Sequence, residues 1–472
     1  MDEHALTRLR AELRSADSEL IRALARRIRL VKRIGMLKQK LEIGVVDPAA
    51  ERSVIENFVA SAKKAGVNER TGRRIAELLI EVSVDLQMQR LPPKAPKDFM
   101  LKQLSQKMLA AEKRGRKLIR LDIGEPRVRT PPAAAREAKR YLSQKATILY
   151  GSSQGLPELV DAIVERLNDQ HGIRLQRSNV LVVPGGRFGI YAGIRSTVSS
   201  LERVVVPQPA WPAYESCVSL VGGRMLRVST CLENGWDIDL STLEEALKLR
   251  PRMLVLNNPS NPTGKVLSAK RFEAVMELAR KYRTIVLSDE VYTSYSNVPV
   301  PSVLEHPECE AIYVNSFSKE FSMTGWRVGY VVADEQTIRK MRAFLETTLT
   351  NVPEFVQRAA LAVIDDARGE AAHARERIGK RVRMACEELR EGGFEFRAPD
   401  GGFYLFPRIT GREIDSEKFV DYLFTKYAVG VLPGSIFGEY RNFLRLAITE
   451  SEVAVKTGIR RIVKAIGEWQ RR

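Results

Sequence analysis

The 472-residue sequence predicts a multidomain protein, with an all-α N-terminal segment followed by an α/β region built on a mainly parallel sheet. The first ninety residues lack strand-like runs and place apolar residues every three or four positions. Beyond residue 180, short β-branched runs alternate with helical stretches, the pattern of α/β layers. A proline-rich stretch separates the two patterns, and the length alone predicts about three compact units.

The N-terminal segment begins with a long amphipathic helix, expected over residues 3–42 and about 60 Å long. Its apolar positions are Leu6, Leu9, Leu13, Ala16, Leu20, Leu24, Ile28, Val31, Ile34 and Leu37. Two shorter helices, near Ala49–Lys64 and Glu69–Arg90, are too short to cover this stripe. We therefore expect a partner chain to cover it, in an intertwined helical dimer.

Polar residues on these helices suggest an anion site. Arg27 and Lys38 are eleven residues apart, so they take nearly the same angular position and can converge on one small anion. Arg10 lies about 25 Å from Arg27 along the axis, on another face, and would reach a partner's pocket in an antiparallel dimer. Two further pairs are spaced i, i+4: Asp47 with Glu51, and Ser83 with Gln87. Such spacing is also typical of a solvated face, so these residues alone leave both interpretations open.

The segment Leu91–Lys97 contains three prolines in seven residues. Proline ends a helix and stiffens an extended spacer. We place a linker at residues 92–99 and the domain boundary near residue 95.

The α/β region has strand-like runs at Val180–Val183, Val204–Val206, Met253–Leu256, Ile285–Leu287, Ile312–Val314 and Val328–Val332. Asn261, Asp289 and Lys319 each fall at or just beyond the C-terminal end of such a run. Open α/β sheets bind ligands at that edge, so we expect the three side chains to meet there.

Lys319, in the run Asn315–Arg327, resembles the Schiff-base lysine of a pyridoxal-phosphate enzyme. Such an amine binds the cofactor covalently and, once released, moves a proton at the substrate's α carbon. Arg327, eight residues further on, and Ser316 can hold the cofactor phosphate. A single lysine is usually solvated, so the assignment depends on its companions.

Four companions have suitable chemistry. A pyridine ring withdraws electrons only while its nitrogen is protonated, and Asp289 is placed to face that nitrogen. Asn261 and Tyr292 can donate hydrogen bonds to the phenolic oxygen, and Arg445 offers a planar fork for an α-carboxylate. Alone, each also fits a turn, a helix cap or a surface position. Their order and spacing together favour the cofactor site.

With these residues in place, residues from about 100 to 472 resemble a class I aminotransferase of fold type I. Other residues match landmarks of that family, and the resemblance implies their roles. Gly124, in Leu121–Pro126, would lie over the substrate, and Trp211 would stack on the pyridine ring. Tyr150 would reach the phosphate of the partner subunit, Gly185 and Gly186 would form the turn under the phosphate, and Pro399–Tyr404 and Pro433–Phe437 match segments of the small domain. The resemblance implies pyridoxal 5'-phosphate as cofactor and a dimer. It also implies a large domain at about 140–345 and a smaller α+β domain at about 100–139 plus 346–472.

Arg187 follows the glycine turn, where some family members have a lysine that meets a substrate's distal carboxylate. One hypothesis is that Arg187 selects dicarboxylic substrates such as glutamate, aspartate or prephenate. The alternative is that Arg187 serves only the phosphate or the surface. The sequence leaves both open.

Residues 5–90 resemble the all-helical chorismate mutase domain found fused to aromatic-biosynthesis enzymes. The resemblance assigns active-site positions to Arg10 of the neighbouring chain, Arg27, Lys38, Asp47, Glu51, Ser83 and Gln87. Chorismate is a dianion that rearranges without a nucleophile, so its site must hold two carboxylates and stabilise charge on the breaking ether oxygen. Cationic side chains and the Gln87 amide suit that task, and Glu51 suits the ring hydroxyl. One position departs, because Ala50 stands where many members have arginine, with Arg52 just after the glutamate.

Composition narrows the setting. No apolar run approaches the 18 residues of a membrane span, and the charged N-terminus opens a helix, so neither a membrane partner nor a signal peptide is expected. The cysteines, Cys217, Cys231, Cys309 and Cys386, lack metal-ligand spacing and indicate reduced thiols in a cytoplasmic protein. The four histidines form no cluster, so no metal site is expected.

The net charge of +18 raises the alternative of a nucleic-acid partner, since some transcription regulators carry an aminotransferase-like domain. Their DNA-binding modules have short helices and a β-hairpin, which this N-terminal segment lacks. Anionic substrates and the cofactor phosphate explain the charge equally well, so no nucleic-acid partner is expected.

The sequence therefore predicts a bifunctional enzyme of phenylalanine and tyrosine biosynthesis, acting as a homodimer or larger homo-oligomer. It would convert chorismate to prephenate, and transaminate prephenate or an aromatic 2-oxo acid with glutamate or aspartate. An aspartate aminotransferase with an appended mutase is the main alternative, and an aminotransferase-like transcription regulator is a remote one.

Overall fold

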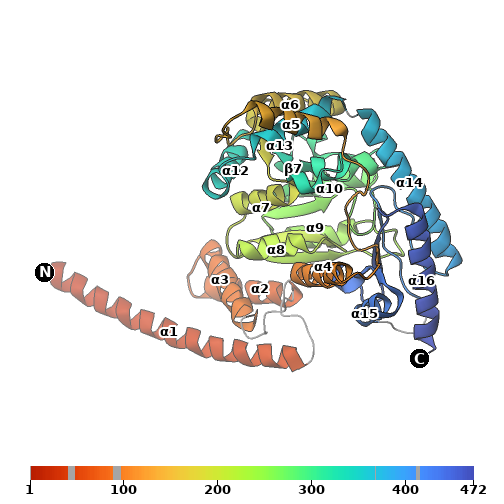
Figure 1. Cartoon of the computed structure of the whole chain (residues 1–472). Helices are drawn as coiled ribbons and strands as arrows, with labels where there is room; N and C mark the ends of the chain where they lie inside the picture. The colour runs from red at the N-terminus through yellow and green to blue at the C-terminus, as the bar shows by residue number, and fades with distance from the viewer. Residues whose placement is uncertain (1, 41–47, 89–96, 367, 411–414, 472) are drawn as a thin grey trace. The chain divides into compact units, whose positions relative to one another are not determined.

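The structure, a computed structural model, describes residues 2–40, 48–88, 97–366, 368–410 and 415–471 (Figure 1). The chain forms two compact units, Met1–Ala95 and Pro96–Arg472. Most of the expected linker, and Asp47, lie outside the described residues. Within the described part of the chain, no helix is long and apolar enough to cross a membrane.

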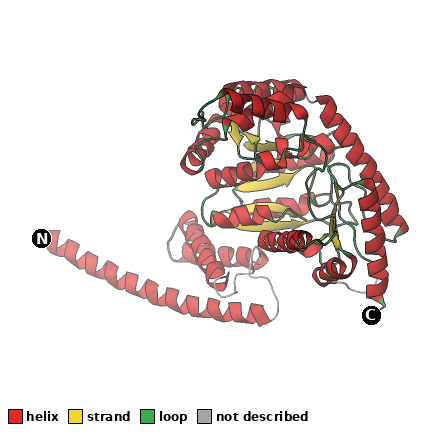
Figure 2. Cartoon of the chain, viewed as in Figure 1, coloured by secondary structure: helices red, strands yellow, loops and turns green. Residues whose placement is uncertain are grey.

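The first unit is helical over its described residues, as predicted (Figure 2). Its helices are α1 (Asp2–Lys40), α2 (Pro48–Lys64) and α3 (Glu69–Met88). α3 packs against both α1 and α2, and its buried residues include Ala76, Ile80 and Val84. Most of the apolar stripe of α1 stays exposed, for example Leu13 at 63% and Leu20 at 66%. Among the described residues, therefore, little covers the apolar face of α1.

The second unit is built on a seven-stranded sheet. In spatial order its strands are β2 (Val180–Val183), β8 (Gly329–Val332), β7 (Ala311–Ser316), β6 (Ile285–Asp289), β5 (Met253–Asn257), β3 (Arg203–Gln208) and β4 (Arg224–Ser229). All neighbours are parallel except β8, which is antiparallel to both β2 and β7. The mainly parallel sheet and six of its strands match the sequence prediction. The edge strand β4 was missed because its arginines and serine mask any apolar run.

Helices cover both faces of this sheet (Figures 1 and 2). One face packs on α5 (Pro132–Gln144), α6 (Pro157–His171), α9 (Leu240–Lys248), α10 (Ala269–Tyr282) and α13 (Glu354–Asp366). The other packs on α7 (Gly186–Thr197), α8 (Ala213–Leu220) and α12 (Glu335–Thr348). Along β2, Val180 and Val182 enter the first core and Leu181 and Val183 the second. Strands buried on both faces explain the continuous apolar runs in the sequence.

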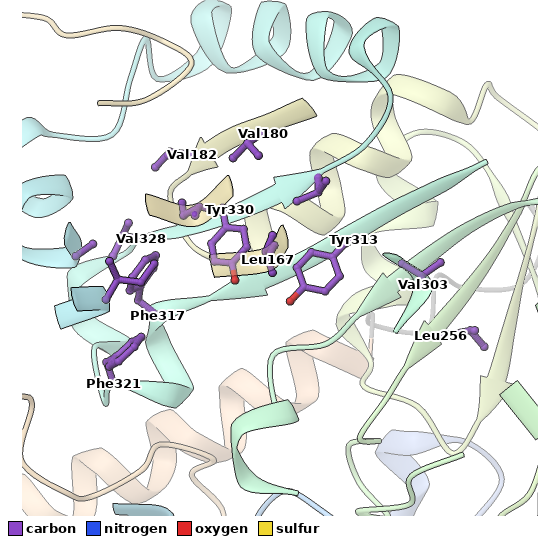
Figure 3. Packing of buried hydrophobic residues seen from close by; sticks show 14 of the residues in the cluster. Leu167, Val180, Val182, Leu256, Val303, Tyr313, Phe317, Phe321, Val328 and Tyr330 are labelled. Atoms are coloured by element: carbon purple, nitrogen blue, oxygen red, sulfur yellow. The ribbon is translucent and has the colours of Figure 1, made fainter. Parts of the chain in front are cut away.

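Figure 3 shows the first of these cores from close by, with Tyr313 and Tyr330 from neighbouring strands beside Leu167 of α6. α5 and α13 contribute to this core through Ala134 and Ala359. Both helices reach beyond the 140–345 range expected for the large domain. Their many alanines do not indicate which sheet they cover, so nothing in the sequence assigned these helices to the large domain.

A smaller α+β part completes the second unit. Its elements are α4 (Lys97–Lys113), α14 (Arg368–Glu391), α15 (Ser416–Tyr427), α16 (Glu452–Gln470), a two-stranded parallel sheet of β1 (Ile119–Arg120) and β10 (Val429–Gly430), and a three-stranded sheet ordered β11 (Leu432–Pro433), β12 (Leu444–Ala447), β9 (Tyr404–Leu405). α14 and α16 pack side by side (Figure 1). Their apolar faces share one core with β9 and β12. This core holds Arg445 of β12 beside the carboxyl edge of the large sheet.

Candidate active sites

A cavity of about 340 Å³ in the second unit lies beyond the carboxyl ends of β5, β6 and β7. Those strands are hydrogen-bonded neighbours, which brings together residues that are distant in sequence. The predicted site residues that line this cavity are Gly124, Gly186, Arg187, Trp211, Asn261, Asp289, Tyr292, Ser316, Lys319, Arg327 and Arg445. Gly185 adjoins it through Gly186.

Lys319 lies on α11 (Phe317–Glu320), the short helix that follows β7. Its Nζ donates a hydrogen bond to the carbonyl of Gly124 at 2.5 Å. Burial lowers the pKa of Lys319 to about 8. The positive charges of Arg445 and Arg327 also lower this pKa, whereas the negative charges of Glu125 and Asp289 raise it. The shift raises the uncharged fraction of the amine near neutral pH well above that of an ordinary lysine, as a nucleophile requires.

Asp289 ends β6 and is fully buried within the cavity wall. Tyr214 donates a hydrogen bond from its hydroxyl to Asp289 Oδ2 at 2.6 Å. Burial raises the pKa of Asp289 to about 6, although Tyr214 and the Val291 amide oppose that rise. A buried carboxylate of this kind is stabilised by a cationic partner, such as a protonated pyridine nitrogen.

The opposite end of the cavity suits a phosphate. α7 begins at Gly186, and Gly185 precedes it at a φ of 89°, which favours glycine. A Cβ on Gly185 would lie 2.6 Å from Arg327 Nη2, so the turn and the arginine approach too closely for a side chain. Backbone amides at a helix N-terminus, with an arginine beside them, form an anion site. Ser316 lies at the same edge and donates to the Val328 carbonyl at 3.1 Å.

Arg445 is 3% exposed and lies between two aromatic rings, 4.6 Å from the centroid of Tyr404 and 5.4 Å from that of Phe437. It donates to the Asp122 carbonyl and, at 3.4 Å, to Asn261 Oδ1. Its Nε is buried and has no hydrogen-bond partner among the described residues. A buried guanidinium with an unused N–H suits a substrate carboxylate.

Two tyrosines of the cavity wall were not among the predicted site residues. Tyr214 pairs with Asp289, and the Tyr404 hydroxyl lies 3.0 Å from that of Tyr292 in a shared hydrogen bond. Tyr404 ends one of the landmark segments and Tyr214 follows Trp211 by three residues, but only the folded chain shows where the two side chains point. Tyr404 also explains Gly124, because a Cβ there would lie 1.9 Å from the Tyr404 hydroxyl.

Tyr150 does not line the cavity and is 86% exposed. Arg187 does line it, with its guanidinium 4.5 Å from the centroid of the Trp211 ring. Burial and then the charge of Arg187 lower the pKa of Arg327. Two cations therefore share one end of the cavity.

In the helical unit, Arg27 of α1 donates from Nη1 to Ser83 Oγ at 2.5 Å and to the Leu79 carbonyl at 2.8 Å. Ser83 is buried, and burial lowers the pKa of Arg27. Lys38 and Glu51 are half-buried, and Arg10 is exposed. Gln87 lies in α3, but its side chain, like the whole of Asp47, is outside the described part. The structure thus brings Arg27 and Ser83 together directly.

The comparisons with known proteins match both units of the chain. The model of the family "Aminotransferase class I and II" matches residues 116–462. The chain belongs to this aminotransferase family. The "Chorismate mutase type II" model matches residues 9–88, so the first unit is a chorismate mutase domain. The protein is an enzyme of two classes, an isomerase and a pyridoxal-phosphate-dependent transferase.

Similar aminotransferases include an aspartate aminotransferase of Pyrococcus horikoshii, 32% identical over 74% of this chain and 90% of its own length. A probable aspartate/prephenate aminotransferase of Aquifex aeolicus is 30% identical over 75% of this chain and 92% of its own. The crystal structure of an aspartate aminotransferase from Thermotoga maritima has a TM-score of 0.73 and 28% identity, covering 78% of this chain and 99% of that one. The fold of the second unit is therefore that of an aminotransferase.

The described residues fit pyridoxal 5'-phosphate, the cofactor of this family. The glycine turn and Arg327 form an anion cradle that excludes a Cβ, burial raises the pKa of Asp289 as it would for a carboxylate that awaits a cation, and Arg445 has an N–H without a hydrogen-bond partner among the described residues. Among the described residues, no cluster of His, Cys, Asp or Glu could hold a metal ion.

Proposed function

We propose that the protein converts chorismate to prephenate and transaminates prephenate, or an aromatic 2-oxo acid made from it, with glutamate or aspartate. The observation that carries this proposal is the pairing of a chorismate mutase domain with an aminotransferase on one chain. A relative named as a probable aspartate/prephenate aminotransferase supports the choice of substrate. The product of one domain would then be a substrate for the other.

For transamination, we assign roles to the cavity residues. The cofactor, when bound, supplies an electron sink. Lys319 binds it covalently and then moves the proton at the substrate's α carbon, as an amine with a pKa near 8 can do. Asp289 keeps the ring nitrogen protonated, and Arg445 binds the α-carboxylate. Asn261 and Tyr292 donate to the phenolic oxygen, while Trp211 stacks on the ring and Gly124 lies over the substrate.

At the phosphate end we assign binding to the α7 turn at Gly185 and Gly186, with Arg327 and Ser316. The exposure of Tyr150 fits a residue that acts on a second chain's cofactor. That assignment requires a homodimer or larger homo-oligomer, in which each cavity is completed by its neighbour.

Arg187 is proposed to bind the distal carboxylate of glutamate, aspartate or prephenate. Its place in the substrate cavity, against Trp211, supports this role over a surface role. Its charge also reaches Arg327, which keeps the phosphate-binding alternative open.

The Arg187→Ala variant separates the two roles. If Arg187 binds a distal carboxylate, kcat/KM falls about 100-fold for glutamate and prephenate but much less for neutral amino acids, because only the former lose a charge-assisted bond. Steady-state kinetics on matched amino-acid pairs measure this difference. An equal loss for all substrates, with weaker cofactor retention, assigns Arg187 to the phosphate.

For the mutase, we propose that Arg27, Lys38 and Arg10 of a neighbouring chain hold the two carboxylates of chorismate. Gln87 would stabilise the ether oxygen, Glu51 would bind the ring hydroxyl, and Asp47 and Ser83 would line the same pocket. The bond between Arg27 and Ser83 supports a shared pocket wall. The exposed stripe of α1 supports a second copy of the chain, because large apolar faces are rarely left to water.

We further propose a mutase domain at 1–91, a linker at 92–99 and a cytoplasmic location. The division of the chain into compact units between residues 95 and 96 supports the domain and linker bounds. The four cysteines with free thiols support the cytoplasmic location. The main alternative, an aspartate aminotransferase with an appended mutase, is favoured by the relatives with that name. No comparable observation favours the transcription-regulator alternative.

A further inference from the structure

Two carbonyl groups of one loop contact the proposed reactive residues of the transaminase cavity. The Asp122 carbonyl accepts from Arg445 Nη2, and the Gly124 carbonyl accepts from Lys319 Nζ at 2.5 Å. Between them, the Ile123 carbonyl accepts from Thr449 Oγ1 at 3.2 Å. The position of the loop 122–124 therefore fixes where both the reactive amine and the carboxylate-binding guanidinium lie.

The loop is held from behind by Arg120. Its Nε and Nη2 donate to the two carboxylate oxygens of Asp122 at 2.8 and 2.9 Å, and its Nη1 donates to Glu112 Oε2 at 2.6 Å. The side chains of Arg120 and Asp122 are each 1% exposed. Burial alone would lower the pKa of Arg120, but the bonds and charges of Asp122 and Glu112 outweigh burial and raise it. The ion pair is thus buried and bidentate.

The surroundings leave this pair little freedom. β1 pairs with β10, and the Leu121 amide donates to the Gly430 carbonyl at 2.8 Å. A Cβ on Gly430 would lie 2.9 Å from Asp122 Oδ1, so the backbone of β10 packs directly on the carboxylate. Movement of Asp122 would therefore be transmitted to its own carbonyl, where Arg445 binds.

Glu112 connects the same pair to the substrate side of the cavity. It lies at the end of α4, and α4 contributes Leu101 and Ser105 to the cavity lining. The ion pairs of Arg120 therefore join one wall of the cavity to the loop that contacts Lys319 and Arg445.

Stability alone is a weak reason for such a pair. Replacing a buried ion pair by apolar residues is often neutral or stabilising, since desolvation offsets the attraction. Its value lies in fixed geometry, because a bidentate arginine–carboxylate pair has one orientation. We propose that Arg120 is a positioning residue for transamination, which acts through Asp122 to orient Arg445 for substrate carboxylates and Lys319 for proton transfer. This inference rests on the proposed roles of Arg445 and Lys319.

The test compares Arg120→Lys and Glu112→Gln with Arg397→Lys in the full-length, cofactor-loaded protein. Arg120→Lys keeps the charge but loses the bidentate fork, and Glu112→Gln removes only the outer carboxylate. Arg397→Lys is the control, because Arg397 also pairs with an aspartate, its Nη2 donating to both carboxylate oxygens of Asp400 at 2.9 and 3.0 Å, but does not line the cavity. The readouts are KM against kcat, the dissociation constant of the unreactive dicarboxylate maleate, and the pH titration of the lysine–cofactor absorbance.

For Arg120→Lys we expect KM for every amino-acid substrate, and the maleate dissociation constant, to rise about tenfold, the loss of one well-oriented hydrogen bond to a charged group. The absorbance titration shifts as well, because the Gly124 carbonyl moves relative to Lys319. For Glu112→Gln we expect the same changes at about two- to threefold. This milder substitution serves as the test if Arg120→Lys does not fold.

A lower melting temperature with unchanged KM, maleate affinity and titration would overturn the proposal and leave Arg120 a structural residue. So would equal changes in Arg397→Lys. Arg445→Lys separates failure of the inference from failure of the proposed function. If that variant keeps normal KM values, the carboxylate role of Arg445 is itself wrong.

Discussion

At the scale of single residues, the transaminase cavity holds its ionisable groups away from their usual pKa values. Burial raises the pKa of Asp289 to about 6 and lowers that of Lys319 to about 8. Both shifts increase the uncharged fraction of these two side chains near neutral pH in the cofactor-free protein. Such groups commonly mark functional sites, because their charge is costly until a ligand pairs with it.

The Asp289→Asn variant tests this cost. The pKa of Asp289 has its ordinary value of 3.8 in the unfolded chain and rises to about 6 in the folded chain. Between those values the unfolded chain releases its proton while the folded chain keeps it, so the free energy of unfolding falls as pH rises. Above pH 6 the penalty is constant, about 3 kcal/mol at most.

Cofactor-free Asp289→Asn should therefore be more stable than the parent at pH 8, and the gain should shrink as pH falls from 6 toward 4. Urea unfolding at several pH values measures this trend. A variant that is less stable by the same amount at every pH would show that the bond from Tyr214, and not the charge, dominates at Asp289.

The sequence predicted that Lys319, Asp289 and Asn261 meet at one edge of the sheet, because each lies at or just beyond the end of an apolar strand, and all three line one cavity. It did not predict Tyr214 and Tyr404, which act through a contact with another part of the chain. Nor did it indicate that Arg120 and Asp122 form a buried pair, since charges two residues apart on a strand-like run also fit an exposed edge.

At the scale of elements, periodicity predicted α1 and the buried strands, where one pattern is sustained over the whole element. β4 was missed because it lies at the sheet edge and its residues are mostly half-buried or exposed. The long α1 shows the limit of reasoning from one chain. Its pattern predicts a buried apolar face, whereas the face is exposed within a single chain.

A Leu13→Glu substitution on α1 tests whether a second copy covers that face. Leu13 is 63% exposed here, so the change costs little within one chain. In an intertwined dimer it would bury a charge in an apolar interface, which is strongly unfavourable. We expect at least a tenfold loss of mutase kcat/KM, with normal transamination. Ser15→Glu, on the opposite side of the same helix, is the matched control, and equal activity of the two variants would argue against the dimer.

At the scale of the whole molecule, two enzyme classes share one chain with a net charge of +18. Chorismate, prephenate, glutamate and the cofactor phosphate are all anions, and the residues proposed to bind them include several arginines and a lysine. The domain order and both enzyme classes followed from sequence. The choice of 2-oxo acid did not, because the proposed selection by Arg187 depends on how that side chain meets a substrate.

The most direct test of the account supplies chorismate, glutamate and pyridoxal 5'-phosphate to the purified protein and identifies the products by mass. Lys319→Ala, which loses only the reactive amine, and Arg27→Ala, which loses only the mutase arginine, are the paired controls. We predict that chorismate disappears and arogenate forms, that Lys319→Ala stops at prephenate, and that Arg27→Ala leaves chorismate largely unchanged. Prephenate that accumulates without any aminated product, while glutamate and aspartate are exchanged normally, would contradict the link between the two activities.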